Sequence, residues 1–114
     1  MDSATEWSAA EKKIARCAFE AALEKALAAA LADFKARAAA VLTPMEMWTI
    51  GEDLQRQRRE IDQRFDYRYS QLTHVFAELI HLGLLDEAAL AGLAEAKRAD
   101  VRRALSFMKR RDGS

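Results

Sequence analysis

The fold of this chain is decided at one short stretch, Leu42-Thr43-Pro44-Met45-Glu46-Met47. Thr43 suits the N-cap of a helix, Pro44 suits the first helical position, and Glu46 completes a capping box with Thr43. Leu42 and Met47 occupy the two positions that pack across such a cap. The stretch therefore predicts that one helix ends just before it and that another begins at Pro44 after a tight turn.

The composition agrees with an all-α protein. The chain has 114 residues, of which 51% are hydrophobic and 32% charged, with only four glycines and one proline. Alanine, leucine, glutamate and arginine dominate, and all are strong helix formers. Because this length suits one domain, we predict a single all-helical domain over residues 1–114.

A first long helix is expected upstream of the turn. Ser8-Ala9-Ala10-Glu11 is a second capping box, so this helix should begin near Ser8 and run to about Val41. At 1.5 Å per residue it would be roughly 50 Å long. An apolar stripe follows one side of it: Phe19, Leu23, Leu27, Leu31 and Phe34.

A second long helix is expected downstream of the turn. Heptad spacing of apolar residues continues from Pro44 to about Leu82. Gly83 then suits the left-handed position after a helix, and Leu84 is placed to contact Leu79 as in a Schellman motif. Residues 8–82 are therefore predicted to form a long helical hairpin of two antiparallel helices.

The remaining residues are predicted to form a small helical head over residues 83–108. Asp86 can cap a short helix over residues 87–91, and a last helix is expected over residues 94–108. The charged residues 109–114 are expected to be a frayed tail.

The helix lengths predict a homodimer. A compact domain of this size has a radius of gyration of only about 13 Å, which two helices near 50 Å exceed. A lone hairpin would leave wide apolar stripes in water, whereas two hairpins paired into a four-helix arrangement would cover them. The stripe positions expected at this interface are Leu54, Ile61, Phe65 and Leu72.

Two residues of the second helix have open interpretations. Arg58 interrupts the apolar stripe, so its guanidinium needs a hydrogen-bonding partner. It either finds that partner on the second copy of the dimer or remains available to bind a carboxylate of another protein through two N–H groups. Trp48 is either an anchor at an interface or a core residue that covers the Thr43–Pro44 turn. The neighbouring basic residues alternate with acidic ones and are interpreted as a solvated face: Arg56, Arg59 and Arg64.

Composition and motifs disfavour several functional classes. Eighteen basic and eighteen acidic residues give a formal net charge of zero, so nucleic-acid binding is not expected. No glycine-rich phosphate loop or placed catalytic set suggests an enzyme or a cofactor. No apolar run suits a membrane span or a signal peptide. The single Cys17 is interpreted as a structural thiol buried in the protein. The chain is therefore expected to be cytoplasmic. The cations at 102–103 and 109–111 are interpreted as solvated charges that complement helix ends.

A metal-binding bundle is the alternative from a different class. Glu78-x-x-His81 has the spacing used in di-iron four-helix bundles. Such a site needs further carboxylates from other helices, for which Glu20 or Glu24 is available. The competing interpretation is a polar flank beside the apolar stripe, and this interpretation is favoured because a two-residue motif is common by chance.

A set of residues in the second half of the chain has a spacing that matches a known family over about residues 45–105 without gaps. The set is Trp48, Leu54, Arg58, Glu60-Ile61-Asp62, Phe65-Asp66, Arg68, Ser70, Val75-Phe76-Ala77, Leu79, Gly83, Leu85, Leu90, Gly92-Leu93 and Lys97. Through these residues the chain resembles the cyanobacterial fluorescence recovery protein family, and the Trp7-Ser8 start also looks similar.

The resemblance implies a non-catalytic helical homodimer. Such proteins bind the photoactivated orange carotenoid protein, speed its return from the red to the orange form and end phycobilisome quenching. Trp48 and Arg58 match family positions tied to the dimer and to the functional surface. The residues expected to contact the partner are Trp48, Glu52, Arg58, His74 and Phe76.

The chain departs from the family pattern near this expected surface. Gly51-Glu52 stands where the family commonly has His-Asp, and His74 stands where it tends to have an apolar aromatic residue. The alanine- and arginine-rich first helix is also atypical. These departures leave a second reading open, in which the same fold serves a different client protein in a bacterium without phycobilisomes.

Overall fold

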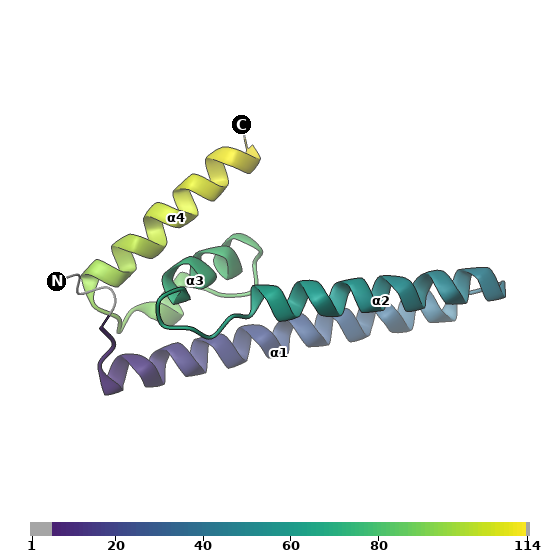
Figure 1. Ribbon diagram of the computed structural model, residues 1–114, viewed down its shortest axis with the longest axis horizontal. Coiled ribbons are helices and arrows are strands. Elements are labelled where there is room, and N and C mark those ends of the chain that lie inside the picture. Colours follow the sequence, from purple (N-terminus) through teal and green to yellow (C-terminus); the bar gives the residue numbers. More distant parts are fainter. Residues whose placement is uncertain (1–5, 114) are drawn as a thin grey trace.

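The computed structural model describes residues 6–113, in which the regular structure is entirely helical. Helices α1 and α2 form an antiparallel stalk, and the later elements form a head beside the N-terminal half of α1 (Figure 1). The extents of 58 × 34 × 22 Å and the radius of gyration of 17.0 Å confirm an elongated shape. The elements are α1 (Ala9–Ala39), α2 (Pro44–Arg64), α3 (Leu72–His81), the 3₁₀ helix η2 (Glu87–Leu90) and α4 (Glu95–Gly113).

Both predicted capping boxes form. The Glu11 amide donates to the Ser8 hydroxyl over 3.1 Å, and the Glu46 amide donates to the Thr43 hydroxyl over 3.2 Å. The Glu46 carboxylate accepts in return from the backbone N–H of Thr43 and of Leu42. The predicted hydrophobic contact across the second cap does not form, because Leu42 is 88% exposed.

The prediction of one continuous helix from Pro44 to Leu82 is wrong. Helix α2 ends at Arg64, and residues 65–71, here called the strap, are mostly non-helical before α3 begins. Phe65, Tyr67 and Tyr69 alternate along the strap. An irregular, more extended backbone lets such alternate residues face the same way, whereas a helix would spread them around its circumference. Phe19 of α1 contacts the rings of Phe65 and Tyr67 at 5.4 and 4.9 Å, so tertiary packing overrides local helix propensity.

The end of α3 forms the predicted Schellman motif. Gly83 adopts φ 78°, and the Leu84 amide donates to the Leu79 carbonyl over 2.9 Å. The Gly83 amide donates to the Ile80 carbonyl over 3.0 Å. The positive φ is the reason for glycine at this position.

The head contains the expected short turn and a longer last helix than expected. Asp86 caps η2 through a bond from the Ala88 amide, and Gly92 then lets the chain pass closely over α1. A Cβ atom at Gly92 would lie 2.5 Å from the Ile14 side chain. Helix α4 continues through residues 109–113, so that part of the predicted frayed tail is helical. Ser114 lies outside the described residues.

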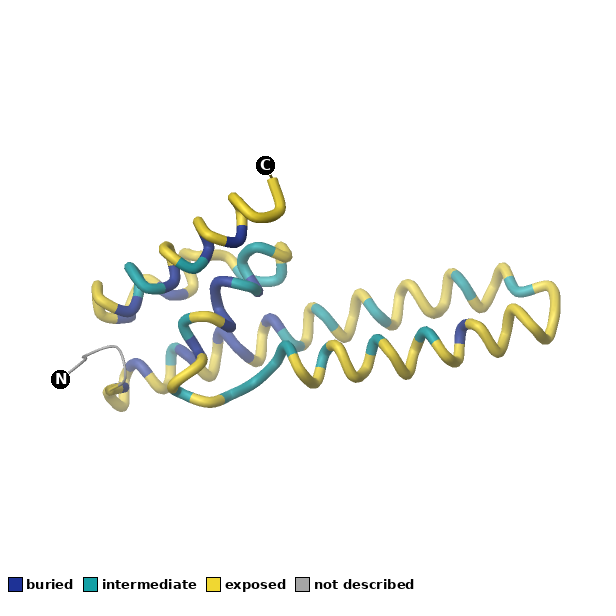
Figure 2. The backbone as a smooth tube through the Cα atoms, turned by 45° about the horizontal axis from the view of Figure 1, so that its top comes forward, coloured by how far each residue is buried: buried dark blue, intermediate teal, exposed yellow. Residues whose placement is uncertain are grey.

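The hydrophobic core lies in the head and not in the stalk. Every buried residue of α1 falls between Glu11 and Ala22, while α2 buries only Ile50 (Figure 2). The head therefore folds around α3 and the start of α1, and the stalk projects beyond it with its apolar side exposed. The core residues are Trp7, Ala15, Ala18, Phe19, Ala22, Leu72, Val75, Phe76, Ala77, Leu79, Leu90, Leu93, Val101, Leu105 and Met108.

Candidate functional site

The stalk exposes apolar side chains on both of its helices. Leu27, Leu31 and Phe34 of α1 recur at helical spacing, and so do Met47 and Leu54 of α2, so each series follows one face of its helix. An isolated monomer seldom exposes a large contiguous apolar patch without a binding role. We call this set the stalk stripe, and its residues are Leu27, Leu31 and Phe34 of α1 with Met47, Trp48 and Leu54 of α2.

The stalk stripe includes a groove near the α1–α2 turn. Its volume is about 550 Å³, and Trp48 stands at its edge with 65% of its surface exposed. Gly51 lies in the lining, and a Cβ atom there would meet nothing within 4 Å. Glycine costs about 1 kcal/mol in a helix interior, so at Gly51 it leaves the groove open rather than relieving a clash. The lining is Phe34, Ala38, Val41, Met47, Trp48, Ile50, Gly51 and Leu54.

The stalk has a polar edge where α1 meets α2. Asp53 of α2 accepts hydrogen bonds from Arg37 of α1 at 2.7 Å and from Arg56 at 2.6 Å. The Arg37 hydrogen bond is the main cause that lowers the pKa of the Asp53 carboxyl. This ion pair ties the two helices together away from the stalk stripe. Arg56, interpreted from the sequence as solvated, is exposed and paired with its i−3 neighbour.

Arg58 has no ion-pair partner within residues 6–113, and its neighbours one turn away on α2 are both apolar and polar. It follows Leu54 by one turn and precedes Ile61 by one turn, and it is exposed. Glu52 is likewise exposed on α2. A guanidinium with free donors beside an apolar surface is suited to meet a carboxylate of another molecule.

Two predicted contact residues are buried instead. Phe76, expected at the partner surface, and Leu72, expected at the dimer interface, are both 0% exposed in the core of the head. Both predictions are corrected. The helix is interrupted at the strap, and α3 therefore packs against α1 and α4. Phe65 is partly buried against Phe19, and His74 is exposed on α3. The predicted residues that remain together on α2 are Trp48, Glu52, Leu54, Arg58 and Ile61.

The described residues do not support the metal-binding alternative. Across residues 6–113, no three His, Cys, Asp or Glu side chains are placed to hold a metal ion. Glu78 instead lies 3.9 Å from Arg64, and His81 Nε2 lies 2.6 Å from the Asp112 carboxylate. Cys17 is exposed, which corrects the expectation of a buried thiol.

A buried ion pair between α1 and α4 was not predicted from the sequence. The Lys97 side chain is only 2% exposed, and its ammonium lies 3.2 Å from the Glu11 carboxylate. It also donates to the Glu6 carbonyl and lies 5.0 Å from the centre of the Trp7 ring. Glu11 accepts in addition from the Ala94 amide over 2.8 Å. We call this contact the Glu11–Lys97 lock, and it holds the head against the start of the stalk.

Glu11 was visible in the sequence only as a capping residue. Its second role joins residues 86 positions apart, and no local pattern reports such a contact.

In the part of the chain that the structure describes, none of the helices is both long and apolar enough to cross a membrane.

The chain matches known proteins along most of its length. A family model described as photoprotection regulator fluorescence recovery protein matches residues 7–106. The fluorescence recovery protein of Synechocystis is 32% identical over 96 residues, which cover 84% of this chain and 88% of that protein.

Solved structures of related proteins have the same fold. The fluorescence recovery protein of Fremyella diplosiphon matches with a TM-score of 0.84 at 35% identity, over 90% of this chain and 100% of that chain. The Synechocystis structure matches with a TM-score of 0.84 at 31% identity, over 89% of this chain and 99% of that chain.

Proposed function

This chain belongs to the fluorescence recovery protein family, and we propose that it binds photoactivated orange carotenoid protein and accelerates its return from the red to the orange form. The family is one of photoprotection regulators, so the chain is not an enzyme. The observation that carries the proposal is the stalk stripe, with its open groove beside the exposed Trp48 and the unpaired Arg58. In the cytoplasm this activity would end antenna quenching.

A regulator of this kind works through differential binding. It accelerates relaxation only if it binds the transition state between the open and compact forms more tightly than the open form. It shifts the equilibrium only if it also prefers the compact form. Rigid helices that carry an apolar surface and an unpaired guanidinium can supply such a preference. Surfaces of the client that form only as the client becomes compact can contact these groups, whereas the open form cannot.

We propose that the protein acts as a homodimer through the stalk stripe. Exposed apolar side chains of α1 and α2 lie side by side, and two copies related by a two-fold axis would cover them isologously. The polar edge formed by Arg37, Asp53 and Arg56 would stay in water. Arg58, placed within the apolar surface, would then find a carboxylate on the second copy or on the client.

The test of the function is the dark relaxation of photoactivated orange carotenoid protein, followed by absorbance. Addition of this protein at substoichiometric amounts should increase the rate, because a regulator is released after each event. The control is the same amount of heat-denatured protein. An unchanged rate in the presence of intact dimer would reject this client.

Leu54→Glu is expected to weaken dimerisation at least about 100-fold, because a carboxylate would be buried in an apolar interface without a partner. Leu54 is 36% exposed in one chain, so the substitution should leave the monomer folded. Sedimentation velocity across a concentration series measures the dissociation constant.

The matched control is Gln63→Glu, which adds the same charge on an exposed position of α2 away from the stalk stripe. Should Leu54→Glu dimerise as tightly as Gln63→Glu, the stalk stripe is not the dimer interface. Leu72→Glu is not a usable test, because Leu72 is buried in the head.

Arg58→Leu is expected to reduce the acceleration of relaxation by about tenfold or more, the usual loss when a charged contact to a partner is removed. Thermal stability should change little, since exposed positions without partners contribute within about 0.5 kcal/mol. Relaxation rates and melting curves are measured on the same samples.

Arg59→Leu is the control for this variant, because Arg59 is exposed one residue further along α2. A comparable loss of activity in both variants would show that general charge matters and not the position of Arg58. Parallel losses of activity and melting temperature in Arg58→Leu would make Arg58 a structural residue.

The second candidate is a protein-interaction module of the same fold with a different client. Gly51 and His74 favour it, because one opens the groove of the stalk stripe and the other places an imidazole on the exposed side of the head. Unchanged relaxation of orange carotenoid protein by the intact dimer would select this function.

A further inference from the structure

Four basic residues surround one serine on the last helix. Ser106 of α4 is exposed, and its hydroxyl forms no hydrogen bond within residues 6–113. Two of the basic residues lie one helical turn before it and two lie one turn after it, at spacings that bring side chains together on a helix. Three of them line a hollow of about 700 Å³ together with Ser106. The four are Arg102, Arg103, Lys109 and Arg110.

The serine distinguishes this cluster from other exposed cations of the chain. The pair Lys12–Lys13 also lacks ion pairs within residues 6–113, but the serine beside it, Ser8, is the N-cap of α1. The pair Arg58–Arg59 has no serine or threonine within four residues. Across the described residues, no serine or threonine other than Ser106 has more than one lysine or arginine within four positions.

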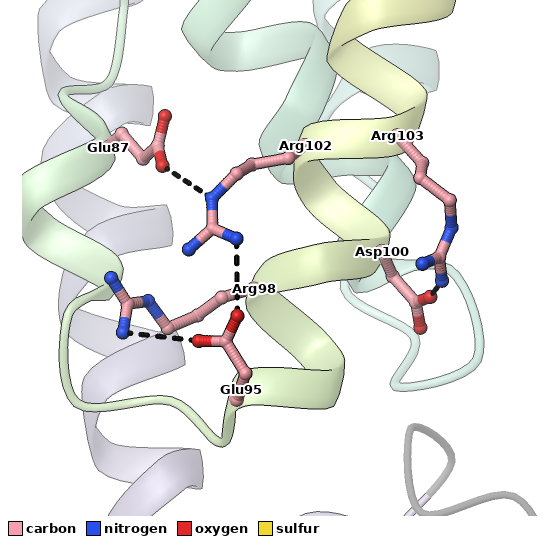
Figure 3. A network of polar contacts seen from close by, with 6 residues as sticks. All are labelled: Glu87, Glu95, Arg98, Asp100, Arg102 and Arg103. Atoms are coloured by element: carbon pink, nitrogen blue, oxygen red, sulfur yellow. Dashed lines mark hydrogen bonds and ion pairs between the residues drawn. The ribbon is translucent and has the colours of Figure 1, made fainter.

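Two of the four cations already contact carboxylates. Figure 3 shows that Arg102 bridges Glu87 of η2 and Glu95 in the first turn of α4, with both contacts at 3.3 Å. The contact with Glu95, followed by that with Glu87, raises the pKa of the Arg102 guanidinium. Arg103 contacts Asp100. The two Arg102 contacts are longer than the usual 2.7–2.9 Å of such charged pairs, so a stronger anion nearby can replace them.

We propose that Ser106 is a phosphorylation site. The Ser106 Oγ attacks the γ-phosphorus of a nucleoside triphosphate that is held by a protein kinase. The Oγ–P bond forms as the bond from phosphorus to the β-phosphate oxygen breaks. The hydroxyl proton passes to a carboxylate of the kinase, and the nucleoside diphosphate leaves. Kinases select their substrates by charge pattern, and Arg103 and Arg102 supply positive charge three and four residues before the serine.

The cations around Ser106 would bind the phosphate once it is attached. A phosphoserine carries a charge of roughly −1.5 to −2 and three strong acceptor oxygens. Lys109 and Arg110 form no ion pair within residues 6–113, so both are available one turn further along the helix. Arg102 can exchange its two long contacts for a bidentate contact with the phosphate. Phosphorylation should therefore strengthen the last turns of α4 and release η2 from Arg102.

The kinase would reach Ser106 by local opening of the end of α4. Only about two turns of helix follow the serine before α4 ends at Gly113. The contact of His81 with Asp112, two partly exposed side chains, ties these turns to α3. Opening also releases Met108 from the core, so the folded chain is modified more slowly than an unfolded one. Chain ends open at lower free energy than the core, and the site stays reachable for this reason.

The test uses the full chain, ATP with Mg²⁺ and a basophilic serine kinase, followed by mass spectrometry of tryptic peptides. Trypsin releases residues 104–109, in which Ser106 is the sole hydroxyl residue. This peptide should gain one phosphate, and Ser106→Ala should abolish the gain. Arg103→Gln should slow it about tenfold or more, because the kinase loses the arginine three residues before the serine. Arg59→Gln, at an exposed arginine of α2, is the matched control and should leave the rate unchanged.

The second measurement is amide hydrogen exchange before and after modification. Protection of residues 107–111 should increase about fivefold, because each contact of the phosphate with a cation one turn away stabilises the helix. Residues 87–90 should lose protection, because η2 loses its contact with Arg102. In Arg102→Gln that loss should be absent, since the contact is already missing.

Three outcomes would overturn the proposal. No phosphate on residues 104–109 of the folded chain, whether or not a synthetic peptide of residues 99–113 is modified, would mean that Ser106 is not a kinase site. Equal modification of Ser70, which has one arginine within four residues, would mean that the cations do not direct the kinase. Unchanged amide exchange after modification would mean that the phosphate recruits none of the cations. None of these results depends on carotenoid-protein relaxation, so failure of either proposal is recognised separately.

Discussion

Lys97→Met is expected to lower the free energy of unfolding by about 3–5 kcal/mol, the usual cost of removing one partner of a buried ion pair. Methionine fills much of the same space, but it leaves the Glu11 carboxylate without its cation and the Glu6 carbonyl without this donor. The contact with the Trp7 ring also loses its cationic component. Equilibrium unfolding in urea, followed by circular dichroism, measures the change.

The control is Lys35→Met, which removes an exposed ammonium from α1. It should change stability by no more than about 0.5 kcal/mol. Glu11→Gln should also destabilise, and the double variant should lose less than the sum because the two side chains interact directly. A loss of stability below about 1 kcal/mol in Lys97→Met would show that water replaces the hydrogen bonds that Lys97 donates to Glu11 and Glu6.

The contribution of the Glu11–Lys97 lock to stability can also be measured as a function of pH. The Ala94 N–H, and after it Ser8 and Lys97, lower the pKa of the Glu11 carboxyl from its usual 4.5. A carboxyl with a lowered pKa in the folded state contributes stability that is complete above the pKa of the unfolded state. That contribution should be lost as the pH falls below 4.5 toward the folded-state value, and the loss should be smaller in Glu11→Gln.

Phe76→Ala is expected to lower the free energy of unfolding by about 3–5 kcal/mol, because it removes a fully buried aromatic ring and leaves a cavity. Phe76 is 0% exposed in the core of the head. The variant should retain its interaction with the client at temperatures where the head is folded. Urea unfolding and the relaxation assay, performed on the same samples, separate the two effects.

His74→Ala is the matched control, since His74 lies two residues earlier on α3 and is exposed. Its stability should stay within about 0.5 kcal/mol of the wild type. If Phe76→Ala were as stable as His74→Ala yet inactive, Phe76 would be a contact residue after all and its burial in the head would be transient.

Local sequence signals predicted several helix ends, although not the end of α2 at Arg64. The capping boxes at Ser8 and Thr43, the Asp86 cap of a short helix and the Schellman motif at Gly83 all form as expected. Each of these depends on atoms within a few residues, so the chain carries the whole interaction in one short segment. The apolar stripe on α2 was likewise visible, because helical periodicity shows which residues share a face.

Interactions between distant segments were not visible in the same way. The strap contains neither glycine nor proline, and a continuous helix satisfies its heptad pattern as well as a break does. The break follows from the packing of its aromatic residues against Phe19, and it moves Leu72 and Phe76 from the expected surface into the core. The assignment of these two residues to an interface failed for this reason.

The sequence by itself determined the helical class, the turn at Thr43–Pro44 and the face of α2 that carries Trp48 and Arg58, because these depend on local bonding and periodicity. Only the tertiary structure decided where α2 stops, which apolar residues remain exposed and how Lys97 meets Glu11. Those outcomes are set by the burial and charge of groups that the chain brings together from distant positions, and no short segment contains both partners.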